Sequence, residues 1–155
     1  MSAPLVPERY GLALPAALRE LIERGVWPRT LAQQRERRLY GDRPRRIDPT
    51  ESSLELCAPP FKTISDTPAH EDYWAKYGAP AELDFSRALV IASFMVDTVL
   101  VLDYAVDAKN PPVKYLDHSP ARGCFWRVVA QDVAALLALL ELDVVRAAQP
   151  GCTRP

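Results

Sequence analysis

The run from Leu89 to Tyr104, LVIASFMVDTVLVLDY, most constrains how this chain of 155 residues can fold. Twelve of its sixteen residues are apolar, and many are β-branched, which favours strands. A membrane span needs about 20 mostly apolar residues. Here Asp97 interrupts the run and Asp103 comes near its end, where charge in a bilayer would be costly. The run therefore predicts two buried strands, Leu89–Met95 and Thr98–Tyr104, paired as a central hairpin with Asp97 exposed at the turn.

Helices are predicted before and after this hairpin. Pro15 suits the first position of a helix, where its missing N–H is not needed, and Leu18, Leu21 and Ile22 after it form one apolar stripe. Gln131–Ala148 is rich in alanine and leucine and is expected to be an amphipathic helix. Two shorter helices are expected at Thr30–Leu39 and Thr67–Tyr77.

Three more strands complete the predicted fold. Ser53–Cys57 alternates weakly, and Val113–Leu116 and Cys124–Ala130 follow the hairpin at short spacing, which is typical of an antiparallel meander. The prediction is an α+β fold: an antiparallel meander sheet with N-terminal helices and a C-terminal amphipathic helix packed on it. The predicted division of the chain is an arm at 1–13, a single domain at 14–148 and a tail at 149–155.

The predicted core joins the sheet to the last helix. Trp126, Phe94, Leu137 and Leu140 are expected to lie in one apolar cluster, because strands and an amphipathic helix bury their apolar faces together. Three aromatic residues fall on one face of the helix predicted at 67–77: Tyr73, Trp74 and Tyr77. They can form a binding face, although aromatic residues at helical spacing more often belong to the core.

The charge of the chain is balanced overall but unevenly distributed. The formal net charge is −1. The segment Arg29–Asp48 carries seven arginines and a net charge of +4, whereas Glu51–Asp107 has a net charge of −7. Clustered arginines can bind the phosphates of a nucleic acid. We favour a solvated surface loop instead, because no aromatic platform is interleaved with these arginines and Tyr40 stands alone.

Two histidines limit the enzymatic options. His118 lies beside Asp117 and Ser119, but adjacent residues in a turn seldom meet in the geometry of a catalytic triad. We therefore expect an exposed turn there, and a surface position for His70 as well. The six glycines are scattered, so the sequence contains no glycine-rich phosphate loop.

Other chemistry-bearing residues also fail to form a recognisable centre. Asp97 and Asp103 are six residues apart on one predicted strand, which separates their carboxylates by roughly 20 Å, too far for shared acid–base work. The three cysteines are too widely spaced for a disulfide framework or a zinc site: Cys57, Cys124 and Cys152. The sequence thus predicts a non-enzymatic protein with no cofactor and no bound metal.

Several segments, taken in order, resemble one known superfamily. They are the opening helix with its exit at Pro28, the segment APPFKT at 58–63, Leu89-Val90-Ile91, Phe94, the Leu-Asp-Tyr end of the second hairpin strand, Pro112-Val113, Trp126 and the leucine-rich C-terminal helix. This arrangement is similar to the SUKH superfamily, which includes fungal cell-wall assembly regulators, the bacterial Syd protein and bacterial immunity proteins. Members usually carry a glycine-rich hairpin turn; in this chain the matching stretch, 92–97, has no glycine.

The resemblance implies a non-enzymatic domain that binds another protein. In bacteria the implied partner is a secreted toxin, neutralised inside the producing cell, and a basic nuclease would meet an acidic surface with complementary charge. An intracellular regulatory or scaffold module of the same fold is the alternative. The opening residues, MSAPLVPERY, lack the layout of a signal peptide, so a cytoplasmic protein is expected.

The predicted partner-binding residues are acidic and lie where exposed positions are expected. Carboxylates are rarely buried without a partner, so each can also serve solubility alone. As a group they carry much of the negative charge of the segment from Glu51 to Asp107. The six candidates are Glu71, Asp72, Glu82, Asp84, Asp97 and Asp107.

Overall fold

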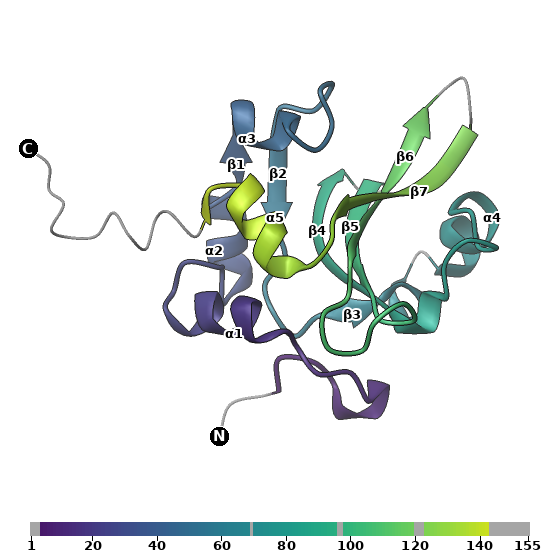
Figure 1. Cartoon of the computed structure of the whole chain (residues 1–155), viewed down its shortest axis with the longest axis horizontal. Coiled ribbons are helices and arrows are strands. Elements are labelled where there is room, and N and C mark those ends of the chain that lie inside the picture. Colours follow the sequence, from purple (N-terminus) through teal and green to yellow (C-terminus); the bar gives the residue numbers. More distant parts are fainter. Residues whose placement is uncertain (1–3, 69, 96–97, 120–122, 143–155) are drawn as a thin grey trace, which may run out of the picture.

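The computed structural model describes residues 4–68, 70–95, 98–119 and 123–142. Its centre is an antiparallel sheet in the order β1-β2-β4-β5-β6-β7, with β3 pairing separately with β4. The strands are β1 (Leu39–Tyr40), β2 (Ser53–Leu56), β3 (Lys62–Thr63), β4 (Ala88–Met95), β5 (Thr98–Asp103), β6 (Val113–Ser119) and β7 (Gly123–Ala130). The fold is therefore α+β, and β4 to β7 form the predicted meander (Figure 1).

The predicted central hairpin is confirmed by the pairing of β4 with β5. Leu89 lies opposite Leu102 and Ser93 lies opposite Val99. All six residues of β5 are buried, because other elements cover both faces of the sheet at this strand. Double coverage explains why the run is apolar throughout rather than alternating. Asp97, predicted to be exposed at the turn, lies outside the described residues.

The sheet separates two apolar cores. Leu100 and Leu102 belong to the larger core, which includes residues of α1 (Ala16–Glu23) and α5 (Val133–Leu139). Val99 and Val101 point to the other face and join a smaller core beneath residues 64–87. That covering segment contains η2 (Ile64–Asp66), the π-helical turn η3 (His70–Trp74), α4 (Ala75–Tyr77) and η4 (Phe85–Arg87). Figure 1 shows α1 and α5 on one side of the sheet and α4 on the other.

The prediction of one cluster for Trp126, Phe94, Leu137 and Leu140 is wrong for Trp126. The other three lie in the larger core, whereas Trp126 lies in the smaller one, beneath α4. Trp126 is nevertheless only 7% exposed. The reason is the two-residue period of a strand: one face of the sheet is covered by the last helix, and the Trp126 position of β7 points to the opposite face.

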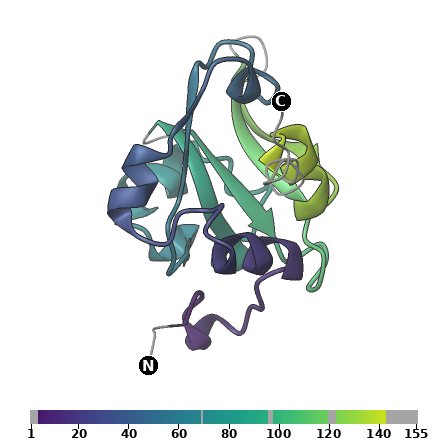
Figure 2. The same cartoon turned by 90° about the vertical axis from the view of Figure 1, so that its left-hand side faces the viewer.

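The first helix follows the prediction closely. α1 begins directly after Pro15 and buries Leu18, Leu21 and Ile22. Trp27, just beyond the helix, is fully buried, and its indole N–H donates to the Cys57 carbonyl at 2.7 Å. In Figure 2, α1 lies between α2 (Leu31–Glu36) and α5. The opening helix is thus tied to the end of β2 as well as to the core.

The helix predicted at Gln131–Ala148 is confirmed in its first half. α5 spans Val133–Leu139, Leu142 is helical again, and residues 143–148 lie outside the described part. Asp132 is its N-cap and accepts the Ala135 N–H at 2.9 Å. The helix ends because Glu141 adopts a left-handed backbone conformation, with φ of 59°. No helix within the described ranges is long and apolar enough to cross a membrane.

Two other predicted helices are partly wrong. The segment Thr30–Leu39 holds α2 with Thr30 as its N-cap, but Leu39 belongs to β1 instead. The helix predicted at Thr67–Tyr77 is η3 followed by α4, and it ends at Gly78 as expected. The described chain also contains short helices at η1 (Glu8–Tyr10) and α3 (Asp42–Arg45).

The arginine-rich segment is not a plain solvated loop, because it contains α2, β1 and α3 and its side chains cap two other helices. Arg29 donates to the Ile22 carbonyl at 2.8 Å, at the end of α1. Arg46 donates to the Leu139 carbonyl at 2.8 Å, at the end of α5, and pairs with Glu141 at 3.0 Å. Cations at helix C-termini satisfy exposed carbonyls and complement the helix dipole. This structural role accounts for much of the local positive charge.

Candidate functional site

An open polar pocket lies where the loop between α3 and β2 meets the strands β5, β6 and β7. Its volume is about 410 Å³. It is lined by Asp48, Pro49, Thr50, Glu51, Thr98, Tyr115, Asp117, His118 and Arg127. Three carboxylates and one guanidinium leave two negative charges in excess when His118 is neutral. We refer to this site as the acidic pocket.

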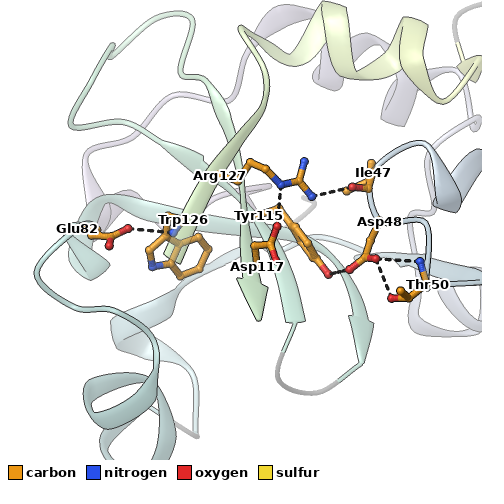
Figure 3. A network of polar contacts seen from close by, with 8 residues as sticks. All are labelled: Ile47, Asp48, Thr50, Glu82, Tyr115, Asp117, Trp126 and Arg127. Atoms are coloured by element: carbon orange, nitrogen blue, oxygen red, sulfur yellow. Dashed lines mark hydrogen bonds and ion pairs between the residues drawn. The ribbon is translucent and has the colours of Figure 1, made fainter. Parts of the chain in front are cut away.

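A network of polar contacts holds the walls of the acidic pocket in place (Figure 3). The Tyr115 hydroxyl donates to Asp48, whose carboxylate also accepts the Thr50 N–H at 2.9 Å. Arg127 donates to Asp117 at 3.0 Å and to the Ile47 carbonyl at 2.7 Å. The same guanidinium lies 5.2 Å from the centre of the Tyr115 ring, which is a cation–π distance. The loop between α3 and β2 is therefore fastened to β6 by Tyr115 and to β7 by Arg127.

The electrostatics keep Asp48 ionised at neutral pH. Burial alone would raise the pKa of Asp48, but hydrogen bonds from Tyr115 and Thr50, together with the charge of Arg127, lower it overall. The pKa of Tyr115 is raised by burial and then by its bond to Asp48, so its hydroxyl stays protonated and keeps donating. The pocket thus presents a fixed negative group at physiological pH.

At the rim of the acidic pocket, β6 also carries His118, which was predicted to lie in an exposed turn. The turn prediction is wrong: His118 is a strand residue opposite Cys124 of β7, and it is partly buried. The Cys124 sulfur lies 3.1 Å from His118 Nδ1. Among the described residues, no group of three or more His, Cys, Asp and Glu side chains is arranged to hold a metal ion.

Three of the predicted partner-binding residues make defined contacts within the chain. Glu82 is exposed, yet its carboxylate accepts the backbone N–H of Trp126 at 3.0 Å. Asp84 caps η4 and accepts from Ser86. Asp107 lies in the connection between β5 and β6, where the N–H groups of residues 109 and 110 hold its pKa below the usual range.

Of the six predicted residues, the four whose side chains the structure describes lie outside the acidic pocket. Asp84 and Asp107 lie at the same end of the sheet. Asp84 precedes β4 and Asp107 follows β5, and the backbone N–H of Tyr104 donates to the Arg87 carbonyl at that end. The acidic pocket includes Thr98, at the opposite end of β5. Glu71 is exposed on η3. The side chain of Asp72 and all of Asp97 lie outside the described part, although Asp97 directly precedes the pocket residue Thr98.

The aromatic face predicted at 67–77 is divided between core and surface. Trp74 is 3% exposed and belongs to the smaller core. Tyr77 is 58% exposed, and Tyr73 lies between them in exposure. The rings of Tyr73 and Trp74 meet edge to face with centroids 4.9 Å apart. One of the three is therefore a core residue, and Tyr77 is the most accessible of them.

The residues of the acidic pocket were missed by reasoning from the sequence. The sequence places Asp48 within the arginine-rich segment and predicts a turn at Asp117. Tyr115 and Asp117 are two residues apart and share one face of β6, so a longer third strand would have placed them together. The contact of Tyr115 with Asp48 spans 67 residues, and no local pattern signals it.

Comparisons with known proteins place this chain in no family. No family model, no curated protein and no solved structure matches it. The resemblance to the SUKH superfamily therefore stays a prediction carried by the segments named above. The fold and the geometry of the acidic pocket stand independently of that resemblance.

Proposed function

We propose that this chain is a non-enzymatic protein-binding domain that acts in the cytoplasm as an immunity protein. Its partner would be a basic secreted toxin domain, a nuclease among the candidates, which it neutralises by direct binding. This function is the one implied by the resemblance to the SUKH superfamily. The observation that carries the proposal is the acidic pocket, an open cavity of about 410 Å³ with an excess of carboxylates.

The pocket suits a lysine or arginine side chain of a protein partner. Its carboxylates are supported by neighbouring donors: Asp48 by Tyr115 and Asp117 by Arg127. A site whose charged groups are already in place loses little conformational entropy on binding. Complementary charge also accelerates the encounter of two proteins and disfavours partners of the wrong sign.

The acidic residues outside the pocket contribute at longer range. Glu71, Asp84 and Asp107 are exposed and extend the negative field of the surface. Their effect on a partner is expected mainly in the association rate and its dependence on salt. Glu82 is a poor probe of this effect, because its reversal would also remove the acceptor of the Trp126 N–H.

Co-expression with the candidate toxin tests the proposal. The toxin domain would be taken from a secreted protein encoded beside the gene for this chain. Growth arrest by that domain should be relieved when this chain is co-expressed, and the two should elute together as a stoichiometric complex. A complex without protection would favour the alternative, a regulatory or scaffold module. If this chain neither relieves the growth arrest nor forms a complex with the toxin domain, the proposal is contradicted.

A further inference from the structure

The β6–β7 hairpin carries a thiol and an imidazole side by side. His118 and Cys124 are direct partners in the register of the two strands, and Cys124 Sγ lies 3.1 Å from His118 Nδ1. Both residues are partly exposed and lie near the end of the β6–β7 hairpin. A nucleophile and a base within hydrogen-bond distance are the usual arrangement of an activated thiol.

From this geometry we propose that Cys124 is a reactive thiol that His118 activates, and that it forms mixed disulfides with small disulfides such as oxidised glutathione. The inference does not rest on the proposed function, although His118 also lines the acidic pocket. It needs His118 in the tautomer with the proton on Nε2, so that Nδ1 accepts from the thiol. The two side chains are held together by strand pairing, not by a flexible loop.

The reaction is a thiol–disulfide exchange. The Cys124 thiol gives its proton to His118 Nδ1, and the resulting thiolate attacks one sulfur of the disulfide. A new sulfur–sulfur bond forms to Cys124 while the original one breaks. The second sulfur leaves as a thiolate and takes the proton from the imidazolium. Cys124 is oxidised, and the incoming disulfide, which is the co-reactant, is reduced to one thiol.

The surroundings of the pair are mixed in charge. Asp117 precedes His118 on β6 and is paired with Arg127 of β7. Asp48 and Glu51, in the loop before β2, line the same pocket as His118. On the face of the hairpin that carries the pair, Cys124 and Tyr73 pack against the smaller core.

The chain contains its own control for this reactivity. Cys57 also lies in the described part and packs against the larger core. Burial, and then the charge of Glu55, raise the pKa of Cys57 to about 12. A thiol of that kind carries almost no thiolate at neutral pH, and the thiolate is the reacting form. Cys57 should therefore react far more slowly than Cys124.

The test is the rate at which each thiol of the folded chain reacts with 5,5′-dithiobis-(2-nitrobenzoic acid), a chromogenic disulfide. A Cys57→Ser, Cys152→Ser double variant isolates Cys124, and adding His118→Phe removes the base while keeping a ring on the strand. Circular dichroism checks that each variant is folded. Adding His118→Gln provides a second version without a base in case the phenylalanine disturbs the hairpin.

The expected result is a loss of at least about fivefold in rate at pH 6 when His118 is replaced. The difference should shrink toward pH 9, where an ordinary thiol becomes ionised without help. Mass spectrometry after treatment of the wild-type chain with oxidised glutathione should find the adduct on Cys124 and not on Cys57. Equal rates and pH profiles with and without His118, or faster labelling of Cys57, would overturn the proposal.

Discussion

Replacement of Trp126 tests the burial of its side chain beneath α4. Trp126 is 7% exposed, and its indole N–H donates to the Gly78 carbonyl at 2.7 Å. A buried tryptophan removes roughly 150–250 Å² from water, which corresponds to about 4–6 kcal/mol at ~25 cal/mol per Å². That figure is an upper bound because unfolded chains are partly compact. We therefore expect Trp126→Ala to lower the free energy of unfolding by about 3–5 kcal/mol.

A second substitution separates packing from hydrogen bonding. Trp126→Phe keeps most of the apolar contact with α4 but leaves the Gly78 carbonyl without its donor, which should cost about 1–2 kcal/mol. Val128→Ala is the matched control, because Val128 lies on the same strand and is 55% exposed; its effect should stay within about 0.5 kcal/mol. The assay is urea unfolding monitored by circular dichroism, and the variants are compared with one shared slope of unfolding free energy against urea concentration. A Trp126→Ala variant as stable as Val128→Ala would refute the burial of Trp126 beneath α4.

Three further predictions concern single contacts. Lys114→Met should lower the free energy of unfolding by about 3–5 kcal/mol in the same assay, because it leaves the buried Asp103 carboxylate without the ammonium group that lies 2.8 Å from it. A loss below about 1 kcal/mol would contradict this prediction. Asp132→Ala should cost about 1 kcal/mol through loss of the α5 cap, whereas Gln131→Ala, at an exposed position, should be nearly neutral. The pKa of Asp48 is lowered in the folded state, so the ionised carboxylate stabilises the fold above about pH 4, and this stabilisation is lost as the pH falls. The stability difference between wild type and Asp48→Asn should therefore shrink between pH 6 and pH 3, and a constant difference would argue against it.

Features that depend on neighbouring residues could be predicted from the sequence. The 89–104 run specified its own hairpin because two short apolar segments rich in β-branched residues, separated by Asp97, have few alternatives to paired buried strands. The first helix was equally clear, since Pro15 and the apolar stripe after it lie within two turns. Such local patterns place elements well but do not say which face each residue meets.

Features set by distant contacts could not be predicted. The face on which Trp126 lies depends on the cover that residues 64–87 provide, and α5 stops at Leu139, whose carbonyl accepts from Arg46. The acidic pocket depends on Tyr115 reaching Asp48 across 67 residues. In each case a pairing between segments decides the outcome, and single-sequence periodicity carries no information about that pairing.

The most direct test of the account is the association rate of this chain with the basic toxin domain, measured against ionic strength. Glu51→Lys reverses a charge in the acidic pocket, and Glu23→Lys makes the same change in net charge on an exposed position of α1. The account predicts that Glu51→Lys slows association several-fold at low salt and flattens its salt dependence, while Glu23→Lys has a much smaller effect. Equal effects of the two reversals, or none from either, would contradict binding at the acidic pocket.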